Sequence, residues 1–262
     1  MMFRPALLFL ALLAPPVRAD NLLILPIPPS LDSRQIGVTV EAGLTRTRSL
    51  PPGELRTARE AMLADQDLDP ALLRALADRR DGLAALRLTR ALVADGGATS
   101  DIAYYGAIAV LTGRIWPLED VIAAMQTLDP ATEPTDRVNM YIAAIYPQAW
   151  AGNALALDAL ITLNGPGRLF GDLSDRTRAR IVEMATQAGD GRIFLHLAIS
   201  DLWEQPDAAM VARAETYLLQ AAAGSHLGVR TAAQTILVQR GLADPAAIAA
   251  PVMAEPAPDA AP

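Results

Sequence analysis

The chain has 262 residues, of which 52% are hydrophobic, 19% charged and 5% aromatic, and its formal net charge is −7. All 22 basic residues are arginine, there is no cysteine, and the only histidines are His196 and His226. Without cysteine there can be no disulfide, thiol nucleophile or iron–sulfur cluster, and without lysine no Schiff-base enzyme. The negative charge opposes nucleic-acid binding. We therefore expect no cofactor, no metal site and no nucleic-acid partner.

The first 19 residues have the features of an export signal. Arg4 supplies a positive start, and Pro5–Ala14 is an apolar run far shorter than the roughly 20 residues of a spanning helix. Val17 and Ala19 provide small residues at a cleavage site. We predict a signal peptide over residues 1–19, cleaved after Ala19; an uncleaved anchor is the alternative. Because no other uninterrupted apolar run reaches membrane length, the mature chain is expected in the periplasm without stable membrane insertion.

Residues 20–53 differ from the remainder in being rich in proline, which blocks helix formation. Ile36, Val38 and Val40 alternate with other residues at the period of a strand, and Leu44–Ser49 could return antiparallel. The segment is predicted to be an extended arm or a small hairpin. A loosely ordered leader between the signal and the next domain is the alternative.

Residues 54–243 are predicted to form an all-α domain of stacked helical hairpins. The chain contains 51 alanines and many leucines, which favour helix, and acidic or hydroxyl caps and prolines stand at several helix starts. Residues 244–262 are mostly alanine and proline and are predicted to be a disordered tail. The predicted helices are Leu55–Ala64, Asp69–Ala77, Gly82–Ala94, Ser100–Leu111, Pro117–Leu128, Thr135–Ile145, Ala151–Leu163, Ser174–Ala188, Arg192–Trp203, Asp207–Ala222 and Leu227–Arg240.

Three stretches share one theme, in which a helix ends in alanines, a glycine turn follows, and a second helix begins: Leu88–Gly113, Ile181–Leu202 and Ala214–Gly241. The pattern resembles tetratricopeptide repeats, and more closely the Sel-like repeats, in under a third of the chain. The resemblance implies an α/α solenoid with a concave surface, usually a protein-interaction scaffold. The Leu-Gly-x-x-Tyr element of these families is missing, and a generic all-α domain explains the same residues.

Aromatic residues are the best candidates for a binding surface, because tyrosine and tryptophan often anchor interfaces. The predicted set is Tyr104, Tyr105, Trp116, Tyr141, Tyr146 and Trp150, with core packing as the alternative role. Other motifs give weaker support for a functional site. Gly165–Gly171 lacks the spacing and the strand of a dinucleotide loop and is expected to connect helices. His196 is expected to be packed, and His226 to cap a helix or lie on the surface.

Together these features predict an exported, periplasmic helical-repeat protein that acts as a scaffold for a protein partner or an envelope polymer. No catalytic residue is assigned. A hydrolase or lyase that uses only carboxylates and acts on an envelope polymer is the alternative. A third possibility is a structural subunit whose N-terminal arm adds a strand to a partner.

Overall fold

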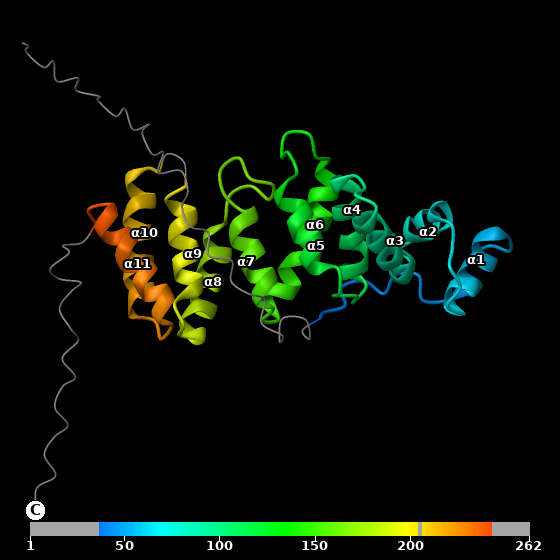
Figure 1. The fold of residues 1–262 in the computed structure, drawn as a ribbon, viewed down its shortest axis with the longest axis horizontal. Helices are drawn as coiled ribbons and strands as arrows, with labels where there is room; N and C mark the ends of the chain where they lie inside the picture. Colours follow the sequence, from blue (N-terminus) through cyan, green and yellow to red (C-terminus); the bar gives the residue numbers. More distant parts are fainter. Residues whose placement is uncertain (1–36, 204–205, 243–262) are drawn as a thin grey trace, which may run out of the picture.

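The computed structural model describes residues 37–203 and 206–242. The predicted signal peptide (1–19), the first part of the predicted arm (20–36) and the predicted tail (244–262) lie outside the described residues. Figure 1 shows the described part as an elongated row of helices, with α1 at one end and α11 at the other. In this part of the chain, no helix is long and apolar enough to cross a bilayer.

The described residues form eleven α-helices and no strand, which confirms the predicted all-α class. Most predicted boundaries agree with the observed ones to within two residues. The helices are α1 (Glu54–Leu63), α2 (Pro70–Ala77), α3 (Gly82–Ala94), α4 (Thr99–Leu111), α5 (Leu118–Gln126), α6 (Thr135–Trp150), α7 (Ala154–Leu163), α8 (Asp175–Ala188), α9 (Arg192–Asp201), α10 (Ala208–Ala223) and α11 (Leu227–Gln239).

Side chains cap the first turn of several helices. Asp69 before α2, Ser174 before α8 and Asp207 before α10 each accept a hydrogen bond from a backbone N–H two or three residues later. His226 does the same for α11 through Nδ1, so its predicted capping role is confirmed. These bonds satisfy N–H groups that have no partner inside a helix. The helix starts are therefore set by local sequence.

The sequence leaves the end of α6 open: the predicted helix stops at Ile145, and a helix Thr135–Trp150 kinked at Pro147 is the alternative. The observed helix continues through Pro147 to Trp150. A proline inside a helix removes one backbone hydrogen bond and crowds the preceding turn. Ile145, Gln148 and the neighbouring Ala149 are fully buried, so burial of this last turn outweighs the cost of the proline.

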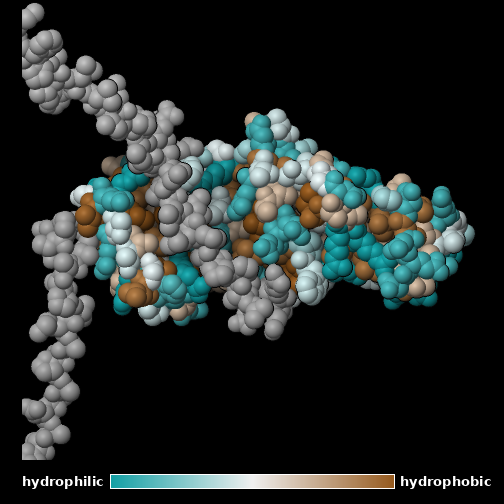
Figure 2. All heavy atoms as spheres, in the orientation of Figure 1, coloured by the Kyte–Doolittle hydropathy of each residue, from teal (hydrophilic) through white to brown (hydrophobic). Residues whose placement is uncertain are grey.

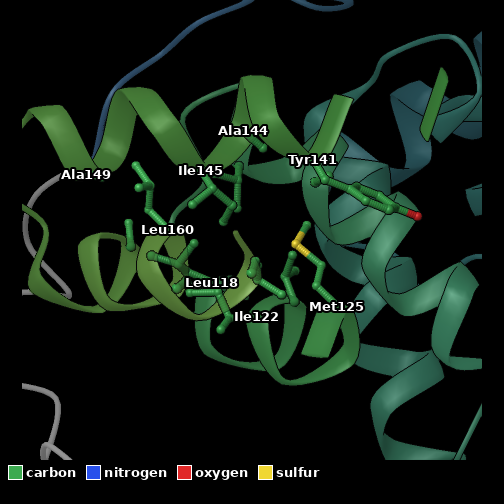
Figure 3. Close-up of a cluster of buried hydrophobic side chains, with 14 of the residues drawn as sticks. Leu118, Ile122, Met125, Tyr141, Ala144, Ile145, Ala149 and Leu160 are labelled. Carbon is green, nitrogen blue, oxygen red and sulfur yellow. The ribbon is translucent and has the colours of Figure 1, made fainter. Parts of the chain in front are cut away.

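Consecutive helices pack side by side as hairpins, and some helices also contact the next but one. The pairs α2–α3, α3–α4, α6–α7, α9–α10 and α10–α11 are of the first kind, whereas α4–α6, α5–α7 and α7–α9 are of the second. Figure 3 shows the core between α5, α6 and α7, where Ile122, Met125, Ile145 and Leu160 meet. This order produces the open, elongated row of Figure 1 rather than a closed bundle.

The described part of the arm, from Gly37, is extended but does not form the predicted hairpin. Val40 N–H donates to Leu111 O at 2.8 Å, and Thr39 forms an antiparallel bridge with Thr112. The segment expected to return as a strand instead contains a 3₁₀ turn, η2 (Thr47–Ser49). The arm therefore pairs with the end of α4, not with itself.

Candidate functional site

The structure separates the six predicted aromatic residues into three places. Two lie together on α4, three lie along α6, and Trp116 stands alone before α5. Tyr105 and Tyr141 are buried, whereas Tyr104, Tyr146 and Trp150 are half-buried. The six therefore do not form one surface.

Tyr104 and Tyr105 pack edge to face, with ring centroids 5.0 Å apart. The guanidinium of Arg74 lies 4.9 Å from the Tyr105 ring centre and donates to the Tyr105 hydroxyl at 3.1 Å and to Asp101 at 3.0 Å. Burial raises the pKa of the Tyr105 hydroxyl, while the bond to Asp101 raises the pKa of Arg74. These contacts fix α2 against α4 and leave little of Tyr105 for a ligand.

Tyr141 is a core residue with a fully buried side chain, and Figure 3 shows its ring beyond Met125, pointing away from the α6–α7 contact. Its hydroxyl donates to Glu133 Oε1 at 2.7 Å, and Ser100 donates to the same carboxylate at 3.1 Å. Burial raises the pKa of the Tyr141 hydroxyl well above its ordinary value, and the bond to Glu133 adds to this. The position is structural rather than ligand-facing.

Four side chains around the end of α6 form what we call the Trp150 cluster: Tyr146, Trp150, Phe170 and Arg180. The rings of Tyr146 and Trp150 meet edge to face at 5.8 Å, and Phe170 lies 6.3 Å from Tyr146. The guanidinium of Arg180 lies 4.4 Å from the Trp150 ring centre. The three rings are half-buried and Arg180 is exposed. The cluster thus offers aromatic and cationic surface held in fixed positions.

Trp116 is the most exposed large apolar residue of the described chain, with 70% of its surface accessible. It follows Ile115, against which Gly37 of the arm packs. On the face shown in Figure 2, apolar residues form small separate patches among hydrophilic ones. Trp203, at 42%, is a second exposed tryptophan of the described chain.

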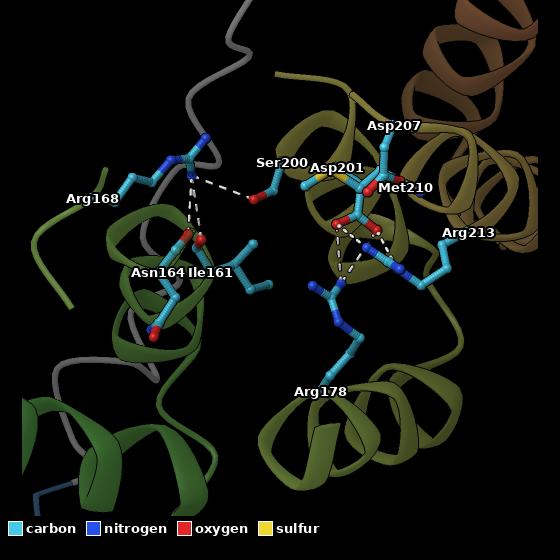
Figure 4. Close-up of polar contacts among 9 residues, drawn as sticks. All are labelled: Ile161, Asn164, Arg168, Arg178, Ser200, Asp201, Asp207, Met210 and Arg213. Carbon is cyan, nitrogen blue, oxygen red and sulfur yellow. Dashed lines mark hydrogen bonds and ion pairs between the residues drawn. The ribbon is translucent and has the colours of Figure 1, made fainter. Parts of the chain in front are cut away.

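The glycine-rich loop after α7 is a connector, as expected, and Arg168 supports it. Figure 4 shows the Arg168 guanidinium against the end of α7, where it donates to Thr162 O at 3.0 Å and to Asn164 O at 3.4 Å. It also donates to Ser200 on α9 at 3.4 Å and lies 5.8 Å from the Trp203 ring centre. Arginine at a helix C-terminus satisfies carbonyls that have no partner inside the helix.

Asp201 joins three helices through two arginines, as Figure 4 shows. Its carboxylate is 3% exposed and accepts from Arg178 of α8 and Arg213 of α10, each at 3.2 Å. The bond to Asp201 raises the pKa of Arg213. The carboxylate is fully engaged in holding α8 and α10 to α9.

The expected packing of His196 is confirmed. Its imidazole Nδ1 contacts Asp158 Oδ1 across the α7–α9 contact, and 15% of the side chain is exposed. Sequence reasoning missed Phe170 and Arg180 as members of the Trp150 cluster. The only sequence signal for them was residue type, because a loop and a different helix bring them to α6.

Comparison of the chain with protein-family models, curated proteins and solved structures gives no match in any of the three.

Proposed function

We propose that the chain is an exported, periplasmic helical-repeat protein of the tetratricopeptide and Sel-like kind, which acts as a scaffold by binding a protein partner. The observation that carries the proposal is the Trp150 cluster, set in an open row of helical hairpins (Figure 1). Tryptophan, tyrosine and arginine are the residue types most enriched at energetic centres of interfaces.

The packing of the cluster favours binding. Each ring is held by a neighbour: Tyr146 packs edge to face on Trp150 and in a tilted contact with Phe170, and Arg180 stacks on Trp150. Tyr146 also donates to Asn164 Oδ1 at 3.1 Å. Side chains that are already ordered lose less entropy when a partner docks. A partner that covers the exposed ring surfaces would therefore bind at a small cost in side-chain entropy.

The buried carboxylates give no specific support to a hydrolase or lyase that uses only carboxylates. In the described part of the chain, Asp81 and Asp201 each contact arginine, and Glu133 accepts from Tyr141 and Ser100. Each joins two or more elements. We therefore place the function in a binding surface.

Affinity capture with a matched control tests the scaffold. The mature chain (20–262) is used to capture partners from periplasmic extract, alongside Arg180→Glu and Leu219→Glu. Arg180 and Leu219 are both exposed, and Leu219 lies on α10 outside the cluster. We expect a specific protein whose capture is lost with Arg180→Glu and kept with Leu219→Glu. Equal capture by both variants, or no specific protein, would overturn the proposal.

Export is tested separately. Residues 1–19 are fused to alkaline phosphatase, which is active only after export to an oxidising compartment. We expect activity with the natural sequence and loss when Leu7–Leu10 is replaced by serines. An inactive natural fusion contradicts periplasmic location without bearing on the binding surface.

A further inference from the structure

One edge of the arm from Gly37 to Val40 is bonded to the protein, and the other edge bonds to none of the residues that the structure describes. Gln148 of α6 pairs with Val38 through the oxygen and the nitrogen of its side-chain amide: Val38 N–H donates to Gln148 Oε1 at 2.9 Å, and Gln148 Nε2 donates to Val38 O at 2.8 Å. Val40 N–H points the same way, to Leu111 O. Because backbone groups alternate along an extended chain, those of the exposed Thr39 face outward, and they bond to no described residue.

The open edge has the properties of a site for strand addition. Unpaired backbone N–H and C=O groups, here those of Thr39, can pair with another extended chain. Val40 is 43% exposed beside it, and Trp116 is 70% exposed at the end where Gly37 packs on Ile115. Apolar side chains of an added strand would meet these two residues.

Positive charge lies along the same path. The arm continues past Arg80, whose carbonyl accepts from Leu44 N–H at 2.8 Å. Arg59, which pairs with Asp81 of the α2–α3 loop, donates to Leu44 O and Thr47 Oγ1, so Arg46 and Arg48 flank a residue held beside this loop. The Arg114 guanidinium lies next to Gly82 in the same corner. We call four arginines around the arm and the α2–α3 loop the corner arginines. None of these four forms an ion pair with a carboxylate of the described residues: Arg46, Arg48, Arg79 and Arg114.

The surrounding charge makes this corner selective. The whole chain carries a formal charge of −7, so unpaired arginines along the arm stand out in an acidic protein. A broad anionic surface such as a bilayer would meet the repulsion of the whole molecule, whereas a short acidic segment meets mainly the local charge. Arginine also binds carboxylates through paired hydrogen bonds.

We propose that the edge of the arm from Gly37 to Val40, with the corner arginines 46, 48, 79 and 114, binds an extended acidic peptide segment of a partner protein. The backbone of the segment pairs with Thr39, an apolar side chain contacts Trp116, and carboxylates beyond the strand meet the arginines. This names the partner chemistry of the proposed scaffold function, but it concerns a surface separate from the Trp150 cluster.

The test uses purified mature chain and a fluorescein-labelled peptide of alternating glutamate and valine, followed by fluorescence anisotropy. One comparison peptide has glutamine in place of glutamate, and another has N-methylated valine amides that cannot donate to a strand edge. The variant Arg46→Glu/Arg48→Glu/Arg79→Glu reverses the corner. Its matched control, Arg90→Glu/Arg176→Glu/Arg240→Glu, reverses three exposed arginines elsewhere.

We expect the acidic peptide to bind the natural chain and the control variant with similar dissociation constants, and the corner variant with a constant at least about ten-fold higher. The dissociation constant of the natural chain should rise with salt concentration. The glutamine and N-methylated peptides should bind at least about ten-fold more weakly than the acidic one. Equal losses in both arginine variants, or equal binding of the three peptides, overturn the proposal. Co-sedimentation of the mature chain with phosphatidylglycerol vesicles, when the chain binds none of the peptides, would also overturn it. Failure here leaves Arg180-dependent capture intact, so the two proposals fail separately.

Discussion

The Arg59 guanidinium of α1 donates to the Asp81 carboxylate at 2.6 Å, and the two side chains are 7% and 3% exposed. Arg59 also donates to Thr47 Oγ1 and to Leu44 O in the arm, while Asp81 caps α3 by accepting from Leu83 N–H at 2.9 Å. One buried pair therefore ties α1, α3 and the arm together. Because both side chains are buried, solvent cannot stabilise either charge if the other side chain is removed.

Replacing Arg59 with alanine should destabilise the fold strongly. The change leaves Asp81 buried without its counter-charge and releases the arm from α1. Breaking one partner of a buried pair costs about 3–5 kcal/mol in the free energy of unfolding. Urea unfolding followed by circular dichroism measures this. The control is Arg87→Ala, whose partner Asp65 is 94% exposed, so its loss should cost less than about 1 kcal/mol. Similar losses in both variants contradict the account.

Gly106 sets the distance between α4 and α5. A Cβ at this position would lie 2.0 Å from Val121 Cγ2. Gly106→Ala should therefore lower the free energy of unfolding by about 1–3 kcal/mol through overpacking, and Val121→Ala in the same chain should recover part of it. Gly228→Ala, at an exposed site in α11, is the matched control, and the better helix propensity of alanine should make it neutral or stabilising. A neutral Gly106→Ala would contradict this packing.

The fold was predictable where the signal is local. The caps Asp69 and Ser174 fixed helix starts because the capping bond spans only two or three residues. The continuation of α6 through Pro147 was left open by the sequence, because Gln148 of its last turn bonds to Val38, which lies 110 residues earlier. The missing return strand has a similar cause. The arm finds its partners in α4 and Arg59, and nothing near it in sequence shows this.

The candidate site was predictable only in its residue types. Tyr141 and Trp150 lie on the same helix, yet one is fully buried and the other half-buried. Phe170 reaches the cluster from a loop, and Arg180 reaches it from α8. Whether an aromatic residue lies in the core or on the surface depends on how distant elements pack against its helix. The periodicity of one helix does not predict this packing.

The contact between His196 and Asp158 should be worth measuring by a double-mutant cycle. Asp158 Oδ1 is buried, contacts His196 Nδ1 and has no hydrogen-bond partner among the described residues. His196→Ala should cost about 1–3 kcal/mol, because it removes the imidazole that contacts this buried oxygen. Asp158→Ala in the His196→Ala background should cost less than it does alone. Additive losses in urea unfolding would show that the two side chains do not interact.

Alkaline pH should unfold the chain through its buried tyrosines. Burial raises the pKa of the hydroxyls of Tyr141, Tyr105 and Tyr146 above the ordinary value of about 10. The native state therefore holds these protons more tightly than the unfolded state. The stability from this difference is complete below about pH 10 and falls as the pH rises further. Tyr141→Phe should flatten the fall. The free energy of unfolding in urea between pH 8 and pH 12, with tyrosinate absorbance, tests this; equal slopes for the natural chain and Tyr141→Phe would exclude Tyr141 as the main contributor.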